Sequence, residues 1–295
     1  MAQPPNKLIN KVALALRADN PLVVEATKEL IKLLREHNTE IFYLSPPVPG
    51  LEAYDFPQIE EKELATSCQV ILVVGGDGTF IRHSIIAAKA GIPILGINCG
   101  RVGFLTEVAR TDIATIIPDI LQGRYFTSTK TLMRGKVCQG ETITELLSVN
   151  DLVVQSLNGR VLKINLSVDG KLVYCERTDG IIVATSAGSS AYALSAGGPL
   201  IVPEVDALEV VNISPTTLTS RPLVLPSSAQ ITIELVLGDE VAVYADGDDR
   251  VDISKGDKVQ IEKDALSVPL IHHESYEIFS AYRSKLGWHS QGSRS

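Results

Sequence analysis

Hydrophobic and polar positions along the first part of the chain form short blocks whose spacing changes from one block to the next. Runs of consecutive apolar residues are typical of buried strands, and apolar residues spaced three and four apart are typical of helices. The blocks predict strands at residues 11–17, 40–44, 70–74 and 91–98, and helices at residues 21–37 and 80–90. Strands that alternate with helices favour a parallel sheet with crossover helices, so we expect an α/β architecture here.

After about residue 126 the pattern changes to one strand after another. Residues 163–168 and 171–175 alternate around Asp169-Gly170, a dipeptide that favours a two-residue hairpin turn. This arrangement predicts an antiparallel pair of strands.

A second segment repeats that arrangement closer to the C-terminus. Residues 231–237 and 241–245 alternate around Gly238-Asp-Glu240 and predict another hairpin, and residues 258–262 predict a further short strand. The second half of the chain is therefore expected to be mainly antiparallel β structure.

These patterns divide the chain into two domains and a tail. We expect an α/β domain at residues 1–125 and a β-rich domain at residues 126–271. The tail, residues 272–295, regains aromatic and apolar residues and is expected to pack back on the first domain. A chain of 295 residues is long enough for two such domains, each with its own core.

Composition narrows the class of protein. The chain is 45% hydrophobic and 21% charged, which is typical of a globular protein, and it contains neither a signal-peptide pattern nor a run near the ~20 apolar residues of a membrane span. We therefore expect a cytoplasmic protein. The four cysteines, which lack the spacing and histidine partners of a metal site, are expected to be reduced and structural (Cys68, Cys99, Cys138 and Cys175).

The net charge of −8 argues against nucleic acid or an anionic membrane surface as a partner. A phosphorylated small molecule stays possible, because it needs only a few local donors. Five arginines are available for that purpose: Arg82, Arg101, Arg134, Arg177 and Arg221.

The most informative motif is the segment Val70-Ile-Leu-Val-Val-Gly-Gly-Asp-Gly-Thr79, an apolar strand that runs into a glycine turn. Bare backbone N–H groups in such a turn bind phosphate, and α/β sheets place ligands at the carboxyl ends of their strands. Asp77 repels a polyanion, so its presence indicates that it orients or deprotonates an attacking hydroxyl. The turn is neither a Walker loop nor G-x-G-x-x-G, which argues against a nicotinamide dehydrogenase.

Three other segments carry candidate chemistry. Gly96-Ile-Asn-Cys-Gly-Arg-Val-Gly103 follows a strand and is either a structural loop or part of the site. Asn150-Asp151 pairs an amide with a carboxylate, although both residue types are also common in turns. From Asp179 to Pro203 a buried strand leads into hydroxyl-bearing and small residues, which would pack poorly as core and therefore favour a polar ligand pocket.

Together the motifs resemble those of the NAD kinase family. The resemblance covers about residues 70–250 in the family's order, and the ending Lys285-Leu-Gly-Trp288 also fits. Each motif alone is of weak to moderate specificity, and the set is highly specific. The matching segments are Gly75-Gly-Asp-Gly-Thr79, Asn150-Asp151, Asp179-Gly180, Gly188-Ser-Ser-Ala-Tyr-Ala-Leu-Ser-Ala-Gly-Gly-Pro199, Ser220-Arg-Pro222 and Asp246-Gly247.

The resemblance implies transfer of the γ-phosphoryl group of ATP to the 2′-hydroxyl of the adenosine ribose of NAD, with a divalent cation such as Mg²⁺. Asp77 would be the catalytic proton acceptor. Because a carboxylate of pKa ~4 is a weak base for an alcohol, it would act first by aiming the oxygen. The donor phosphates would lie on Gly75, Gly76, Gly78 and Thr79.

The resemblance also implies an NAD-binding set. Asp77 and Gly78 would approach the ligand and Arg82 would meet a phosphate. Asn150 and Asp151 would hold the adenine side, although the family has Glu where this chain has Asp151. Arg177 and Asp179 would lie near the nicotinamide half. Ser190, Ala191, Tyr192 and Ser195 would line the adenine and ribose pocket, and Asp248, where the family often has Gln, is carried over only weakly.

Two other classes of function stay open. Phosphofructokinases and diacylglycerol-type lipid kinases share Gly-Gly-Asp-Gly-Thr, so a sugar or lipid kinase is the alternative enzyme, although neither offers a counterpart of residues 188–199. The chain could also be a nucleotide-binding regulator without turnover, but the intact Asp77 argues against it. No metal-ligand cluster is visible, so Mg²⁺ would be bound through donor phosphates and water. The family implies a homodimer or homotetramer.

Overall fold

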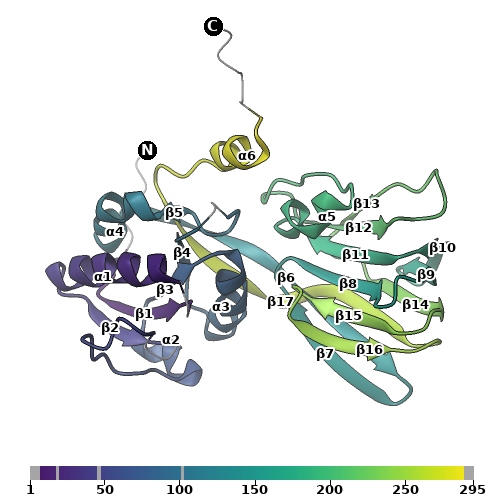
Figure 1. The fold of residues 1–295 in the computed structure, drawn as a ribbon, viewed down its shortest axis with the longest axis horizontal. Coiled ribbons are helices and arrows are strands. Elements are labelled where there is room, and N and C mark those ends of the chain that lie inside the picture. The colour runs from purple at the N-terminus through teal and green to yellow at the C-terminus, as the bar shows by residue number, and fades with distance from the viewer. Residues whose placement is uncertain (1–6, 18–19, 45–47, 101–102, 289–295) are drawn as a thin grey trace, which may run out of the picture. The chain divides into compact units, whose positions relative to one another are not determined.

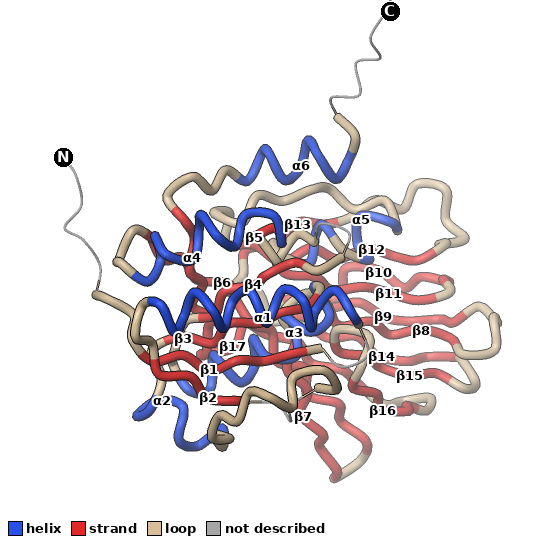
Figure 2. The backbone as a smooth tube through the Cα atoms, turned by 60° about the vertical axis from the view of Figure 1, so that its left-hand side comes forward, coloured by secondary structure: helices blue, strands red, loops and turns tan. Residues whose placement is uncertain are grey.

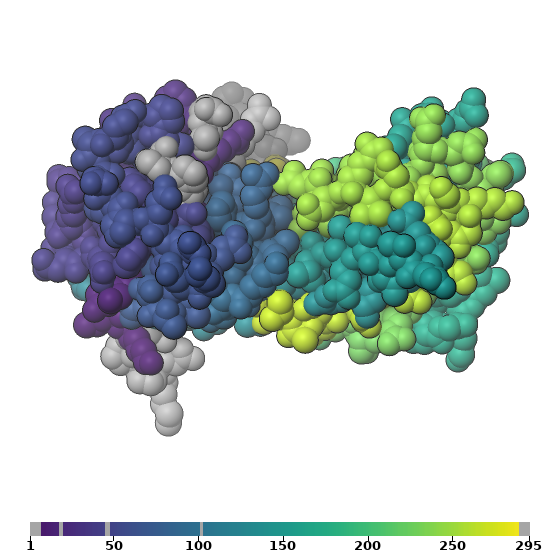
Figure 3. All heavy atoms as spheres, turned by 90° about the horizontal axis from the view of Figure 1, so that it is seen from below, coloured from purple at the N-terminus to yellow at the C-terminus, as the bar shows by residue number. Residues whose placement is uncertain are grey.

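The computed structural model describes residues 7–17, 20–44, 48–100 and 103–288 (Figure 1). It divides the chain into two compact units, one of residues 1–129 with 268–295 (unit 1) and one of residues 130–267 (unit 2). Strands predominate in unit 2, whereas most helices belong to unit 1 (Figure 2). In Figure 3 the side chains of unit 1 are mainly purple and blue and those of unit 2 are teal to yellow-green.

Unit 1 is an α/β unit built on a parallel sheet. Its strands follow the order β2-β1-β3-β4, and every pair in that series is parallel. Strand β4 also pairs with β5 and with the end of β17, again in parallel. The elements are β1 (Lys11–Leu16), α1 (Pro21–Glu36), β2 (Glu40–Tyr43), α2 (Leu64–Ser67), β3 (Val70–Gly75), α3 (Asp77–Ala90), β4 (Ile94–Asn98), β5 (Val108–Ala109), α4 (Ile113–Leu121) and α6 (Ile278–Leu286).

Local sequence explains where α1 begins and where α3 ends. Helix α1 begins after Asn20, whose side chain accepts a hydrogen bond from Leu22 N at 3.0 Å, and Pro21 fits the first turn because its missing N–H is not needed there. Helix α3 ends at Gly91, which adopts the left-handed conformation at φ 66°. The apolar sides of α1 and α4 share one core with β1 and β3, whereas α3 packs against β3 and β4.

Unit 2 consists of antiparallel strands in two sheets around a shared core. One sheet has the order β13-β12-β11-β8-β15-β16, and the other contains β10-β9-β14-β17 with β6 and β7. The apolar sides of both sheets contribute to the core. The elements are β6 (Tyr125–Gln139), β7 (Thr142–Ser148), β8 (Asp151–Ser156), β9 (Leu162–Val168), β10 (Lys171–Thr178), β11 (Gly180–Thr185), α5 (Tyr192–Ser195), β12 (Ala207–Ile213), β13 (Leu223–Pro226), β14 (Ile231–Leu237), β15 (Val241–Ala245), β16 (Asp249–Ile253) and β17 (Lys258–His273).

The first predicted hairpin is confirmed. Strands β9 and β10 pair antiparallel around Asp169 and Gly170, which have φ values of 49° and 74°. Both residues are left-handed, as a type I′ turn requires.

The second predicted hairpin is wrong. Strand β14 pairs with β9 and β17, whereas β15 pairs with β8 and β16 in the other sheet. Alternation identified both strands and their buried sides correctly, but Gly238 to Glu240 carry the chain from one sheet to the other across the core. Because both strands bury their apolar side in the same core, their patterns are the same as those of a hairpin.

Other bounds also differ from expectation: β4 begins at Ile94 instead of residue 91, and β10 continues to Thr178. Two further differences bear on the site. Strand β17 continues to His273, beyond the short strand expected at residues 258–262, and helix α3 begins at Asp77 instead of Phe80. The second difference places the carboxylate of Asp77 in the first turn of a helix. No helix within the described ranges is both long and apolar enough to cross a membrane.

Candidate active site

The glycine turn of unit 1 joins β3 to α3. Gly75 is confined, since a Cβ there would lie 2.9 Å from Thr79 Oγ1. A Cβ on Gly76 or Gly78 would meet no atom within 4 Å. Gly75 is therefore needed for packing, whereas Gly76 and Gly78 leave the backbone at the start of α3 uncovered on the outside.

The carboxylate of Asp77 is held by the segment that follows β4. Oδ2 accepts a hydrogen bond from Phe104 N at 2.7 Å. Oδ1 accepts from Leu105 N at 3.2 Å, from Thr106 N at 3.1 Å and from Thr106 Oγ1 at 3.0 Å. These four donors fix the orientation of the side chain.

Gly103 makes this arrangement possible. A Cβ at that position would lie 1.8 Å from Asp77 Oδ1, so any side chain would displace the carboxylate. The second glycine cluster of the sequence therefore ends against Asp77 in the structure. Arg82 lies further along α3 with an exposed side chain, and Arg101 lies outside the described residues.

In unit 2, Asp246 organises the turn before β8. Its carboxylate accepts hydrogen bonds from Ser148 Oγ at 2.7 Å and from the backbone N–H groups of Val149, Asn150 and Asp151 at 2.8, 2.8 and 3.1 Å. Burial raises the pKa of Asp246, and the hydrogen bonds oppose that rise. The Asn150-Asp151 pair is thus positioned by a carboxylate that lies far away in the sequence.

Asp151 itself is buried beside the carboxyl group of Asp246. Burial, followed by the charge of Asp246, raises the pKa of Asp151 to about 7. Near neutral pH its carboxyl group is therefore partly protonated and can donate a hydrogen bond as well as accept one.

A cavity of about 400 Å³ in unit 2 brings four of the expected NAD-binding residues together: Asn150, Asp151, Ala191 and Tyr192. Gln155 and Tyr244 also line it, and sequence reasoning missed both. Gln155 could have been predicted from the strand pattern, because it lies on the same side of β8 as Asp151 and Val153. The complete lining is Asn150, Asp151, Val153, Gln155, Ala191, Tyr192, Tyr244, Asp246 and Gly247.

Other expected residues lie elsewhere in unit 2. Ser190 donates to Ala187 O at 3.1 Å, and Ser195 is the last residue of the short helix α5. Arg177 is exposed near the end of β10, and Asp179 follows β10 directly. The structure does not place these four or the exposed Asp248 in the lining of the 400 Å³ cavity.

The run of small residues after β11 is tightly packed, which corrects the expectation that it would pack poorly as core. A Cβ on Gly188 would lie 2.0 Å from Asn150 O. Ser189 is completely buried, donates to Ser186 O at 2.7 Å and accepts from Ile201 N at 2.9 Å. Small side chains are needed here because the loop lies directly against the turn that carries Asn150.

Several side chains that sequence reasoning left open have structural partners. Arg134 forms an ion pair with Asp264 at 2.6 Å and another with Glu145, so it is not available for phosphate. Arg221 donates to Leu218 O at 3.1 Å and to Ser220 O at 2.7 Å.

All four cysteines are free thiols. Among the described residues, no three His, Cys, Asp or Glu side chains gather as a metal site.

Comparison with known proteins assigns the family. The family model of the ATP-NAD kinase N-terminal domain matches residues 12–125, and that of the ATP-NAD kinase C-terminal domain matches residues 149–273. The NAD kinase of Thiobacillus denitrificans is 33% identical over 94% of this chain and 96% of its own length. The NAD kinase of Azoarcus sp. is 37% identical over 80% of this chain and 81% of its own.

Solved structures agree with this assignment. An NAD kinase from Archaeoglobus fulgidus in complex with ATP aligns with a TM-score of 0.69 at 28% identity, covering 94% of this chain and 97% of that one. Yeast NADH kinase complexed with NADH aligns with a TM-score of 0.84 over 99% of this chain and 91% of that one. At 20% identity the latter shows a shared fold alone. On the family models and the sequence relatives, this chain belongs to the NAD kinase family.

Proposed function

We propose that the protein transfers the γ-phosphoryl group of ATP to the 2′-hydroxyl of the adenosine ribose of NAD, which gives NADP. The observation that carries the proposal is the held carboxylate of Asp77 at the start of α3, within a chain that belongs to the NAD kinase family. A kinase that acts on an alcohol needs one group that aims the hydroxyl and other groups that accept the donor phosphates.

Asp77 has the capacity for the first task. A carboxylate offers roughly four lone-pair directions, and Oδ2 uses only one of its own, for Phe104 N. The ribose hydroxyl donates to the remaining direction of Oδ2, which points its oxygen at the phosphorus. The bond between the γ-phosphorus and the bridging oxygen of ATP breaks, ADP leaves, and the proton passes to the carboxylate late, as the new P–O bond to the ribose oxygen forms.

The second task falls to the backbone at the start of α3. Its first N–H groups and its dipole favour an anion there, and the absence of side chains on Gly76 and Gly78 lets a phosphate approach closely. The alcohol-bearing ligand lies on residues of unit 2. Asn150 and Asp151 bind the adenine there, and Tyr192, 41% exposed, covers its face.

The proposed reaction includes a divalent cation, which would be bound to the phosphates of ATP. Because the described side chains offer no metal cluster, the residues present suit a cation that arrives on the donor phosphates and keeps water ligands. Its chemistry would be to neutralise charge on the phosphates.

An acceptor screen tests the proposed function. The purified protein is incubated with ATP, Mg²⁺ and one acceptor at a time: NAD, NADH, diacylglycerol or fructose 6-phosphate. We expect NADP from NAD, measured with an NADP-specific dehydrogenase. Phosphate transfer to the lipid or the sugar with none to NAD would assign the chain to another kinase class, and binding of NAD without transfer to any acceptor would indicate a regulator.

Self-association stays a prediction that rests on the family alone. We expect a homodimer or homotetramer by light scattering, and a monomer at micromolar concentration would contradict it.

A further inference from the structure

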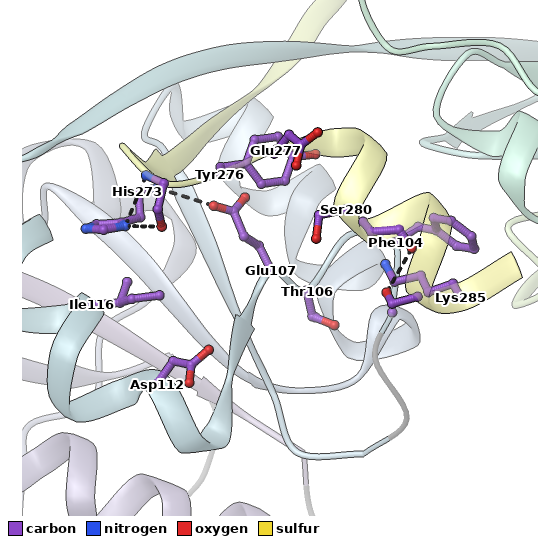
Figure 4. Close-up of a pocket in the computed structure, with 14 residues that line it drawn as sticks. Phe104, Thr106, Glu107, Asp112, Ile116, His273, Tyr276, Glu277, Ser280 and Lys285 are labelled. Carbon is purple, nitrogen blue, oxygen red and sulfur yellow. Dashed lines mark hydrogen bonds between the residues drawn. The ribbon is translucent and has the colours of Figure 1, made fainter. Parts of the chain in front are cut away.

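A second cavity lies within unit 1, and Phe104 and Thr106, whose N–H groups donate to Asp77, contribute to its lining. Its volume is about 270 Å³, and Gly103, Phe104, Thr106 and Glu107 line it together with α6 and the segment that precedes α6 (Figure 4). Small-molecule sites usually begin at roughly 300 Å³, so this cavity suits part of a nucleotide, such as a phosphate group, better than a whole one. Nothing in the site described above uses it.

Lys285 of α6 reaches into this cavity. Its side chain is half-buried, and its Nζ lies 4.1 Å from the centroid of the Phe104 ring. Figure 4 shows Lys285 beside Phe104 at one end of the cavity, with His273 at the other. Phe104 is also the residue whose backbone N–H donates to Asp77, so Lys285 and the proposed catalytic carboxylate contact the same residue.

The nearby carboxylates are already occupied by other donors. Asp77 accepts four hydrogen bonds from residues 104–106. Glu107 accepts one from His273 N at 3.2 Å and is bonded to His272 Nδ1 at 2.5 Å. Among the described residues, no carboxylate oxygen lies within 4.0 Å of Lys285 Nζ.

An ammonium in a partly dry site that has an aromatic ring but no anion beside it gains free energy when an anion arrives. Asp77 and Glu107 are acidic groups near Lys285, and their negative charge opposes the binding of a triphosphate there. A cation beside them offsets that repulsion, and phosphoryl transfer relies on such cations for its electrostatic stabilisation. Lys285 is positioned to supply this charge.

We propose that Lys285 is a donor-phosphate-binding residue, whose ammonium contacts a phosphate of ATP beside the glycine turn of unit 1. This inference rests on the proposed function for the identity of the donor. It adds a residue of the C-terminal helix to a site that was otherwise assigned to residues 75–82.

Protonation gives the inference a distinctive signature. Burial lowers the pKa of Lys285 to about 8, while the charges of Asp77 and then Glu107 oppose that fall. The ammonium is therefore present below about pH 8 and is lost above it. The other titratable groups that line the cavity are Asp112, His273, Tyr276 and Glu277.

Two variants of Lys285 test the contact. We expect Lys285→Met to lower kcat/KM for ATP by a factor of about 100, and Lys285→Arg, which keeps a positive charge, to lose less than tenfold. In the parent, kcat/KM for ATP should fall as pH rises through about 8. In Lys285→Arg that fall should vanish, because a guanidinium stays charged. The KM for NAD should change less than threefold in both variants.

Two comparison variants separate phosphate binding from a structural role of α6. Phe104→Leu removes the ring under Lys285 and keeps the ammonium, and Arg283→Met removes an ion pair of the same helix with Glu277 at 3.0 Å. If Lys285 only holds α6 in place, Phe104→Leu and Lys285→Met should lose activity equally. We expect the fold-loss in kcat/KM for ATP of Phe104→Leu to be less than a third of that of Lys285→Met. Arg283→Met should have the same kcat/KM as the parent.

Calorimetry keeps the inference separate from the proposed function. We expect Lys285→Met to weaken the binding of ATP at least tenfold. The affinity for adenosine, which lacks phosphate, should be unchanged. Equal affinity of parent and variant for ATP would overturn the role of Lys285 even if the parent makes NADP. A parent that binds ATP through Lys285 but makes no NADP would refute the proposed function and leave the phosphate contact intact.

Discussion

At the scale of single residues, the carboxylate of Asp77 has one observed task and one proposed task. It accepts hydrogen bonds that order residues 104–106, and it is the proposed partner of the ribose hydroxyl. Replacement by Asn keeps an oxygen for the donors at Oδ1 but turns an NH₂ group toward Phe104 N. We expect Asp77→Asn to lower kcat by several orders of magnitude while NAD still binds, measured by steady-state kinetics and calorimetry.

A Thr106→Val variant controls for disorder of that segment. It removes the bond from Thr106 Oγ1 at 3.0 Å and keeps the carboxylate with its backbone donors. A hydrogen bond to a charged group contributes about 1.5–3 kcal/mol to stability. Because three backbone N–H donors still hold the carboxylate, we expect a loss of kcat of tenfold or less. A parent-like rate for Asp77→Asn would refute the catalytic role, and equal losses in both variants would indicate that Asp77 only orders the segment.

Tyr192 is the aromatic group assigned to the acceptor. It lines the cavity of unit 2 together with Asn150 and Tyr244 and is 41% exposed. Truncation removes stacking area worth about 1–3 kcal/mol for a base on an aromatic ring. We therefore expect Tyr192→Ala to weaken the binding of NAD by tenfold or more and the binding of ATP by less than twofold. Calorimetry that shows equal losses for both ligands would contradict the assignment.

Sequence alone found some of these residues and missed others for a physical reason. Asp77 could be proposed from the sequence because an acid is chemically out of place among glycines of the kind that bind phosphate. The role of Asp246 was not, because its carboxylate acts on the backbone of residues 149–151, far away in the sequence. Lys285 was visible only as part of a motif, and its contact with Phe104 exists only in the folded chain.

At the scale of elements, the turn between β3 and α3 contains glycines of two kinds. A Cβ on Gly78 would meet open space, and alanine is the better residue in a helix by about 0.5–1 kcal/mol. We expect Gly78→Ala to unfold at an equal or higher temperature and yet to lose at least tenfold in kcat/KM for ATP, because a methyl group would stand where the phosphate approaches. Unchanged activity would remove Gly78 from the site.

Gly96 in β4 offers the matched control. A Cβ there would lie 2.8 Å from the Phe80 ring and 2.9 Å from Thr106 Cα. Overpacking of this kind costs typically about 1–3 kcal/mol. We expect Gly96→Ala to unfold at a lower temperature, measured by calorimetry, which is opposite in sign to the stability change at Gly78.

The elements also show which part of the fold a pattern can predict. Alternation located β14 and β15 and their buried sides, but it gave the wrong partners, because a strand facing the core from either sheet has the same pattern. Turn chemistry supplied what alternation lacks at Asp169-Gly170, where two left-handed residues require a hairpin. Gly238-Asp-Glu240 has no such signature, so its strands could not be assigned to a sheet.

At the scale of the whole molecule, one buried carboxylate makes stability depend on pH. Glu209 of β12 is 0% exposed, and neither of its carboxylate oxygens has a hydrogen-bond partner among the described residues. Its strand neighbours are Ala184 and Val224, which offer no charge. Burial raises the pKa of Glu209 to about 7.

The direction of the pH effect follows from proton binding. The unfolded chain releases the proton of Glu209 near pH 4.5, whereas the folded chain holds it to about pH 7. The free energy of unfolding therefore falls as pH rises from about 4.5 to about 7 and is level above that. Asp151, whose pKa is also raised to about 7, contributes a fall in the same direction.

Replacing Glu209 by Gln removes the titration and keeps a neutral polar group of similar size. We expect equal stability of parent and variant at pH 4, where Glu209 is mainly protonated in both the folded and the unfolded chain. At pH 8 the variant should be more stable by roughly 3 kcal/mol, since one pKa unit is worth about 1.4 kcal/mol. Calorimetric unfolding at both pH values measures this, with exposed Glu204→Gln as the control. Because Asp151 keeps its own titration, the variant should retain part of the slope. A gain at pH 8 no larger than that of the control would show that burial does not raise the pKa of Glu209 in the folded protein.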